Sequence, residues 1–258
     1  MLDIEVMKLS EIIKKTETSI EILPFGEAAI LVEFGKGICP ETHDKVQALT
    51  KYLDCYSLPG MIEYVSAYSS VTVFYDPIKV RKSQNVRVEG KQQFSYQILY
   101  TLLQKIVSKL SKETTHTSRI VEIPVCYGGD FGPDLEYVAG HNKLSMEKVI
   151  EIHTSGKYLV YMIGFAPGFP YLGGMSELIS TPRRESPRMT IPRGAVGIAG
   201  MQTGVYPIET PGGWQLIGRT PLQLFRPTDN PPSLLQAGDT IRFIPIDPNE
   251  YEKYKGGI

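Results

Sequence analysis

The side chains best suited to bind a ligand are concentrated between Tyr161 and Thr220. Residues 183–193 in this region contain four arginines and one acid, although the whole chain is almost neutral, with 27 Lys and Arg against 28 Asp and Glu. Planar guanidinium groups bind carboxylates or phosphates through two parallel hydrogen bonds. The cluster therefore predicts either an anion site or a solvated loop whose arginines pair with backbone carbonyls or with the acid. Its members are Arg183, Arg184, Glu185, Arg188 and Arg193.

A loop rich in aromatic residues precedes this cluster. Residues 164–174 read GFAPGFPYLGG, in which prolines fix the backbone and glycines allow close approach of another group. Such a loop is typical either of a rigid binding surface or of a tightly turned barrel corner with buried rings. Trp214, the only tryptophan, follows Pro211-Gly212, for which we predict a type II turn. A single tryptophan lies more often in a core than in a binding hot spot.

Signatures of other chemistries are missing. The sequence contains no nucleotide-binding glycine loop, no serine-hydrolase elbow and no zinc-protease helix motif. None of its four dispersed histidines has a second His or Cys at metal-ligand spacing, so we expect no metal and no cofactor bound by this chain alone. His153 falls on the apolar side of a predicted helix, which favours a hydrogen-bonded core imidazole over a catalytic base.

Composition excludes further classes of protein. A net charge of −1 supplies no basic field for nucleic acid or for an anionic membrane. No stretch approaches the roughly 18 consecutive apolar residues of a spanning helix, and the N-terminus does not resemble a secretory signal. Three cysteines without CxxC spacing indicate reduced thiols. We therefore expect a cytoplasmic protein that binds neither nucleic acid nor membrane.

The elements that must position these residues divide the chain in two. Residues 1–119 contain 4 Pro and 5 Gly, whereas residues 120–258 contain 15 Pro and 19 Gly, which predicts two different architectures. The first half alternates short β-rich runs with two helical patterns in the order ββαββα, which favours a small α+β layer. The predicted strands are 20–23, 29–34, 61–65 and 71–75, and the helical stripes cover 46–53 and 94–110.

The second half has the pattern of a barrel or sandwich, with many short strands between Gly and Pro turns. A single helix, with Ser145 as its N-cap, interrupts them. The predicted strands are 120–125, 158–163, 195–199, 215–217, 222–225 and 240–244. The expected organisation is an N-terminal extension at 1–18, an α+β domain at 19–112, a linker at 113–119 and a β-barrel domain at 120–248.

Four long motifs make the sequence similar to a known family. GFAPGFPYLGG, PRRESPR, IPRGAVGIAGMQTGVYP and TPGGWQLIGRTP resemble consecutive motifs of the KipI-like family, also called allophanate hydrolase subunit 1 or the 5-oxoprolinase B subunit. The resemblance extends over nearly the whole chain, and residues 1 to about 18 lie outside it. It implies the fold class α+β, with a small α+β N-terminal domain followed by a cyclophilin-like all-β barrel.

The resemblance also implies a function. It suggests a hydrolase subunit, inactive alone, that works with a homologous C subunit and with an A subunit to open 5-oxoproline to glutamate, with ATP used by the assembled complex. Two alternatives are a regulatory inhibitor of a sporulation-type histidine kinase and a subunit related to allophanate hydrolase or urea carboxylase. Peptidyl-prolyl isomerisation is suggested only by the expected barrel, and a fold does not determine a function.

The matching motifs supply the candidate site residues, although none is assigned a catalytic role. Arg188 and Arg219 lie in separate motifs and could converge across the barrel as a clamp for a carboxylate. The alternative is that they satisfy buried carbonyls. The candidates for substrate binding are Arg183, Arg188, Thr203, Tyr206, Arg219 and Thr220. The candidates for contact with a ligand or partner are Phe165, Pro167, Phe169, Tyr171 and Trp214.

Overall fold

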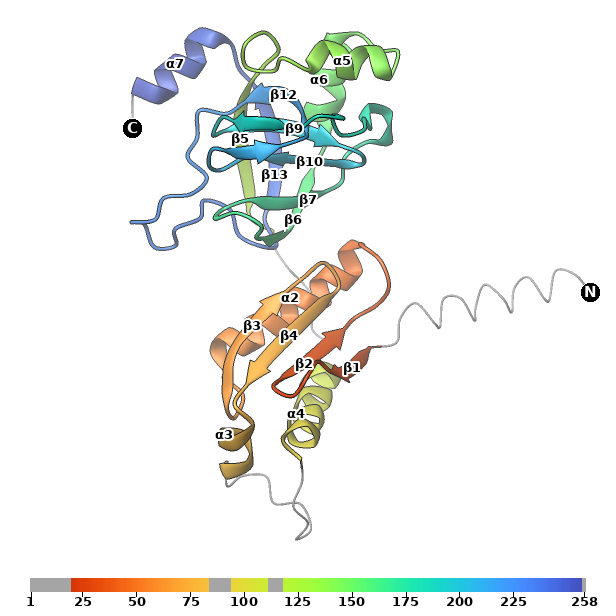
Figure 1. Ribbon diagram of the computed structural model, residues 1–258, viewed down its shortest axis with the longest axis vertical. Coiled ribbons are helices and arrows are strands. Elements are labelled where there is room, and N and C mark those ends of the chain that lie inside the picture. Colours follow the sequence, from red (N-terminus) through yellow and green to blue (C-terminus); the bar gives the residue numbers. More distant parts are fainter. Residues whose placement is uncertain (1–19, 84–93, 111–117, 257–258) are drawn as a thin grey trace, which may run out of the picture. The chain divides into compact units, whose positions relative to one another are not determined.

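The computed structural model describes residues 20–83, 94–110 and 118–256 (Figure 1). These residues fall into two compact units, one before and one after residue 116. The expected extension at 1–18 lies outside the described residues, as does most of the expected linker at 113–119. Ser118 and Arg119, the described end of that linker, hydrogen-bond to Gly238 and Asp239 in the second unit.

The first unit is a four-stranded antiparallel sheet with two long helices (Figure 1). Its strands are β1 (Glu21–Pro24), β2 (Ala29–Glu33), β3 (Met61–Ser66) and β4 (Ser70–Tyr75), in the order β1-β2-β4-β3. In β4, Val71 and Val73 are buried and alternate with half-buried residues, so one face of the sheet belongs to a core. The apolar stripes of α2 (Pro40–Cys55) and α4 (Ser95–Leu110) complete that core.

The order ββαββα predicted for this unit is confirmed, with one addition. A short helix, α3 (Pro77–Lys82), follows β4. The side chain of Asp76 caps it by accepting hydrogen bonds from the N–H groups of Ile78 and Lys79, at 2.8 and 3.2 Å. An Asp N-cap followed by proline is a recognised helix start, so the sequence did contain the signal.

The second unit is a nearly closed, barrel-like sheet of seven strands. The order is β10-β9-β12-β5-β13-β6-β7, and β10 and β7, at its two ends, lie beside each other. Only the pairing of β5 with β13 is parallel among the described strands. The strands are β5 (Ile120–Tyr127), β6 (Tyr158–Ile163), β7 (Pro170–Gly173), β9 (Ala195–Ala199), β10 (Gln202–Val205), β12 (Gln215–Arg219) and β13 (Thr240–Pro245). A separate two-stranded sheet pairs β8 (Arg188–Ile191) with β11 (Thr210–Gly212).

The expectation of a single helix in this half is wrong. The predicted helix is α6 (Met146–Ser155), and the Ser145 hydroxyl accepts the N–H of Lys148 at 3.2 Å as its cap. The others are α5 (Leu135–His141), α7 (Pro248–Gly256) and a 3-10 turn at Glu177–Ile179. Helix α5 has only seven residues, which is too short for apolar periodicity to reveal.

Two local predictions are also wrong. Residues 222–225 form a loop rather than a strand, in which Leu224 is buried and its carbonyl accepts the N–H of Leu234. Pro211 and Gly212 lie in β11 rather than in a type II turn, because β11 pairs with β8. Gly212 accordingly lacks the positive φ that such a turn requires.

The sheet of the second unit separates two hydrophobic clusters. Val196, Ile198 and Val205 belong to the large interior core, whereas Ala195 and Tyr206 belong to a smaller cluster on the opposite face. Neighbouring residues of a strand point to opposite faces, so β9 and the segment of β10 contribute to both clusters. Within the described residues, no helix is both long and apolar enough to cross a membrane.

Candidate functional site

Trp214 lies on two glycines that leave space for its side chain. Gly197 in β9 and Gly204 in β10 are paired directly across the two strands. A Cβ atom at Gly204 would lie 3.1 Å from ring atom Cζ3 of Trp214, and one at Gly197 would lie 3.1 Å from its Cβ. Because any larger residue would push the indole away, the two glycines fix where it rests.

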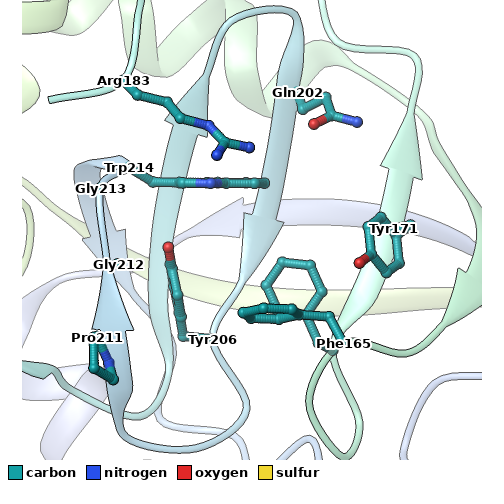
Figure 2. Close-up of a pocket in the computed structure, with 10 residues that line it drawn as sticks. Phe165, Tyr171, Arg183, Gln202, Tyr206, Pro211, Gly212, Gly213 and Trp214 are labelled. Carbon is teal, nitrogen blue, oxygen red and sulfur yellow. The ribbon is translucent and has the colours of Figure 1, made fainter. Parts of the chain in front are cut away.

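Phe169 is the centre of an aromatic cluster beside this tryptophan. Its ring makes edge-to-face contacts, with centroids 5.4 to 5.9 Å apart, to the rings of Phe165, Tyr171, Tyr206 and Trp214. This geometry is the preferred one for aromatic pairs, so the rings hold one another in place. They line a cavity of about 180 Å³, drawn in Figure 2.

Phe165 stands at the rim of this cavity in an unusual backbone conformation. Its φ is +66°, in the left-handed region that residues with a Cβ rarely adopt. A hydrogen bond of 2.8 Å from the N–H of Ala166 to the carbonyl of Gly164 closes a γ-turn around it. Phe165 is nevertheless 75% exposed. A strained residue with an exposed apolar ring is typical of a position kept for contact with a ligand or partner.

Arg183 is the only charged residue among those that line the cavity. Its segment is aligned with that of Trp214 by two hydrogen bonds, from Gln215 Nε2 to Pro182 O at 3.0 Å and from Arg184 N to Gly213 O at 2.8 Å. These bonds flank Arg183 on one segment and Trp214 on the other. Figure 2 shows the guanidinium group and the indole extending in the same direction, into the cavity. In the described part of the chain, no hydrogen bond or ion pair occupies this guanidinium group.

Asp134 binds the two other arginines of the segment. Its Oδ1 accepts hydrogen bonds from Arg184 Nη1 at 3.1 Å and from Arg188 Nη2 at 2.8 Å, and its Oδ2 accepts the N–H of Leu216 at 2.7 Å. Asp134 is only 5% exposed and precedes α5, yet its side chain does not cap that helix. An aspartate in this position usually serves as a cap, so its carboxylate is diverted to the arginines.

Six of the eleven candidate residues line the cavity. They are Phe165, Phe169, Tyr171, Arg183, Tyr206 and Trp214. Pro167 is exposed on the same loop but is not part of the lining. Sequence reasoning missed Gln202, which also lines the cavity, and Asp134, which holds the arginines. Gln202 and Gly204 are two residues apart on one strand, so their side-chain positions lie on the same face of the sheet. This spacing was the only feature of the sequence that could have indicated Gln202.

The remaining candidates have other partners. Arg219 Nε donates to the carbonyl of Arg193 at 2.9 Å, Arg188 pairs with Asp134, and neither arginine lines the cavity. Thr220 is buried, and its hydroxyl accepts the N–H of Leu222. These side chains satisfy backbone groups or a carboxylate within the protein.

Thr203 and His153 form a closed hydrogen-bond chain in the interior. The Tyr127 hydroxyl donates to His153 Nδ1 at 2.8 Å, His153 Nε2 donates to the Thr203 hydroxyl at 2.9 Å, and that hydroxyl donates to the carbonyl of Gly197 at 3.1 Å. A neutral imidazole satisfies every member of this chain. Complete burial lowers the pKa of His153 to about 3. The predicted core imidazole is confirmed.

The lining of the cavity combines aromatic rings with the cation of Arg183 and the polar groups of Gln202 and Tyr206. Burial raises the pKa of Tyr206 to about 12, although Arg183 and a backbone hydrogen bond from Trp214 oppose the rise. The phenol therefore stays protonated at neutral pH and is a weak nucleophile. No group of three or more His, Cys, Asp or Glu side chains among the described residues could hold a metal ion. Apolar walls and one cation suit a small anion with a flat apolar body.

Comparison with known proteins relates this chain to components of an enzyme. The family described as carboxyltransferase domain, subdomain C and D, matches residues 20–235. The 5-oxoprolinase B subunit of Bacillus subtilis (strain 168) is 50% identical over 91% of this chain and 96% of its own length. The 5-oxoprolinase B subunit of Escherichia coli O157:H7 is 40% identical over 85% and 93%. A conserved uncharacterized protein from Pyrococcus horikoshii aligns with a TM-score of 0.51 and 46% identity, over 90% of this chain and 100% of that one.

Proposed function

This chain belongs to the carboxyltransferase domain family, subdomain C and D, and on that premise we propose that it is the B subunit of an ATP-dependent 5-oxoprolinase. The observation that carries the proposal is the near full-length match to relatives that bear this name. The match includes both compact units, so the proposal concerns the described chain as a whole and not one of its domains. The partners we propose are a homologous C subunit and an A subunit.

We assign the aromatic cavity as this chain's part of the substrate site. It combines a cation, Arg183, with the rings of Trp214 and Phe169, and 5-oxoproline combines a carboxylate with a compact flat ring. Because the described residues that line the cavity include no carboxylate, imidazole, thiol or amine, ring opening and the use of ATP are expected to need groups from the partner subunits. The chain alone is therefore expected to be inactive.

Reconstitution tests this proposal. The purified chain is mixed with the A and C subunits of a relative's 5-oxoprolinase, and glutamate release from 5-oxoproline is measured with and without ATP. Turnover is expected only when all three proteins and ATP are present. Failure of this chain to replace the relative's own B subunit, in a mixture that is active with that protein, would contradict the proposal.

A second candidate is a regulatory protein that uses the cavity to dock on a histidine kinase. The exposed ring of Phe165 favours it, because an apolar ring at a rim can anchor a protein partner. This alternative predicts inhibition of kinase autophosphorylation that depends on Phe165 and is insensitive to 5-oxoproline. Activity in the reconstituted complex, with no effect on kinase autophosphorylation, would support the 5-oxoprolinase subunit and contradict the kinase regulator.

A further inference from the structure

We infer that the isolated chain binds a small cyclic carboxylate in the aromatic cavity, with Arg183 as the carboxylate-binding group and Asp134 as the residue that positions it. The choice of 5-oxoproline as the probe rests on the proposed function. Binding without partners goes beyond that function, which requires only that the assembled complex be active.

The cavity sets the size and the shape of the ligand. Its volume of about 180 Å³ is below the roughly 300–1,000 Å³ of pockets for drug-sized molecules, so it suits a single small ring. Trp214 and Phe169, whose ring planes are nearly perpendicular, both offer apolar surface to such a ring. These walls are already held by mutual ring contacts and by the glycine pair, so no partner is needed to form them.

The charge available to the ligand comes from one arginine. Arg184 and Arg188 share the carboxylate of Asp134, and Arg219 donates to a carbonyl. Arg183 is exposed at the cavity and, among the described residues, has neither a hydrogen-bond nor an ion-pair partner. A carboxylate bound to its planar fork would satisfy it with two parallel hydrogen bonds.

Asp134 influences the position of Arg183 indirectly, by holding the chain segment to which Arg183 belongs. The carboxylate holds Arg184, the next residue along the chain, and Arg188 at the start of β8. The same carboxylate binds the N–H of Leu216, two residues after Trp214. Asp134 therefore holds together the two segments whose side chains, Arg183 and Trp214, extend into the cavity (Figure 2).

Stability alone explains this arrangement poorly. The side-chain atoms Arg184 Nε and Arg188 Nη1 are buried, and neither has a hydrogen-bond partner within the structure. Buried ion pairs contribute little net stability, and unsatisfied donors reduce it. The Asp134 side chain also makes no capping hydrogen bond to α5. A cluster that is costly in these ways is better explained by the geometry that it imposes on Arg183.

Trp214 allows a direct test on the isolated chain, because it is the only tryptophan and it lines the cavity. The full-length protein is titrated with 5-oxoproline while its tryptophan emission is recorded, and calorimetry repeats the titration. We expect a saturable change in emission with 5-oxoproline. The same lactam without its carboxylate, 2-pyrrolidinone, is expected to bind at least about tenfold more weakly, because it lacks the group that Arg183 recognises.

Substitutions assign the roles. Arg183→Lys keeps the charge but loses the fork, and we expect affinity to fall about tenfold with an unchanged melting temperature. Arg242→Lys, in β13 and outside the cavity lining, is the matched control and is expected to bind as the unmodified protein does. Equal affinity of the Arg183→Lys variant and the control would overturn the role of Arg183.

A double-mutant cycle separates positioning from a merely structural role. Asp134→Asn should weaken binding in the unmodified protein but have little further effect in the Arg183→Lys background, because the group that it positions has already lost its geometry. Equal losses in both backgrounds would overturn the positioning role. Should Asp134→Asn fail to fold, Arg184→Gln takes its place in the cycle, since it leaves Asp134 paired with Arg188.

The two proposals fail in different ways. No change in emission and no heat with 5-oxoproline, alongside an active reconstituted complex, would overturn the inference and leave the proposed function intact. Binding that depends on Arg183, alongside an inactive complex, would support the inference and contradict the proposed function.

Discussion

The segment that contains strand β10 places side chains on both faces of the sheet in the second unit. The polar groups on these two faces differ in the partners that they have within the protein. Thr203 points inward and closes a hydrogen-bond chain with His153 and the carbonyl of Gly197. On the other face, Gln202 and Tyr206 line a cavity in which the guanidinium group of Arg183 has no partner among the described residues. The polar groups of the inner chain all have partners within the protein, whereas on the outer face the guanidinium group of Arg183 stays available to the ligand that we propose.

We therefore expect the inner face of this segment to determine stability and its outer face to determine binding. A change on the inner face leaves a buried polar group without a partner and reduces the free energy of unfolding. A change on the outer face should alter affinity more than it alters the free energy of unfolding. The following four predictions test whether the two faces are independent, beginning with the largest expected effect on stability.

Removal of the Thr203 hydroxyl should give the largest loss of stability. Thr203→Val keeps the shape of the side chain but leaves Nε2 of His153 buried without an acceptor. We expect urea unfolding to show a loss of about 1–3 kcal/mol, with unchanged binding of 5-oxoproline. Thr154→Val is the control, because that hydroxyl bonds only within its own helix. A binding defect in Thr203→Val would show that the two faces are coupled.

Acid should destabilise the protein through His153. Its pKa is about 3 in the folded protein, below the usual value near 6.5, so between these limits the unfolded chain binds a proton that the folded one does not. Stability from this source is complete above about pH 6.5 and decreases as the pH falls toward 3. At pH 5 we expect a loss of about 1–2 kcal/mol.

The measurement is urea unfolding at pH 7 and pH 5. His153→Asn should show a smaller decrease between the two pH values, whatever its absolute stability, because the titrating group is gone. An identical decrease in both proteins would assign the acid sensitivity to other groups.

A methyl group beneath the indole should disturb binding more than folding. In Gly204→Ala the new Cβ would lie 3.1 Å from Cζ3 of Trp214 and 3.4 Å from Cζ of Phe169, so the rings must shift. We expect a changed tryptophan emission, weaker binding of 5-oxoproline and a stability loss of about 1 kcal/mol. Gly140→Ala in α5 is the control, because its Cβ would have no neighbour within 4 Å and alanine favours the helix. Unaltered emission in Gly204→Ala would contradict the proposed position of the indole.

Phe165 should have the smallest effect on stability. Phe165→Asn removes the exposed ring and places a residue that tolerates left-handed φ at the γ-turn. We expect the free energy of unfolding to stay within about 1 kcal/mol of its original value, or to rise. Affinity for 5-oxoproline should fall a few-fold. A large loss of stability would mean that the ring belongs to the core and not to the rim of a binding site.

Much of the fold was predictable because it depends on short-range pattern. The period-2 alternation of β4 and the apolar stripe of α4 are visible in a few consecutive residues, and both elements form where expected. The exceptions were short elements. Helix α5 and strand β10 contain too few residues for a period to stand out, and the loop at 222–225 resembles a strand only in composition.

The candidate site was only partly predictable. Residue type alone left open whether the aromatic loop and the arginine cluster bind a ligand and favoured a core position for Trp214, and the family resemblance made these residues candidates. It could not show that Thr203 and Tyr206, three residues apart along the chain, face opposite sides of the sheet. Alternate residues of a strand point to opposite faces of the sheet. Which residues face the core is known only once the register of β10 with β9 is known.

The sequence by itself determined that this chain has an arginine-rich segment beside an aromatic loop, with glycines near the only tryptophan. Only the tertiary structure decided which arginine is available to a ligand. Asp134 precedes Arg184 by 50 residues, and nothing local distinguishes it from an ordinary helix cap. Folding brings its buried carboxylate to Arg184 and Arg188, where it accepts hydrogen bonds from both, and leaves Arg183 as the one charged group that lines the cavity. The physical reason is that a buried carboxylate must find cations, and chain topology determines which ones it reaches.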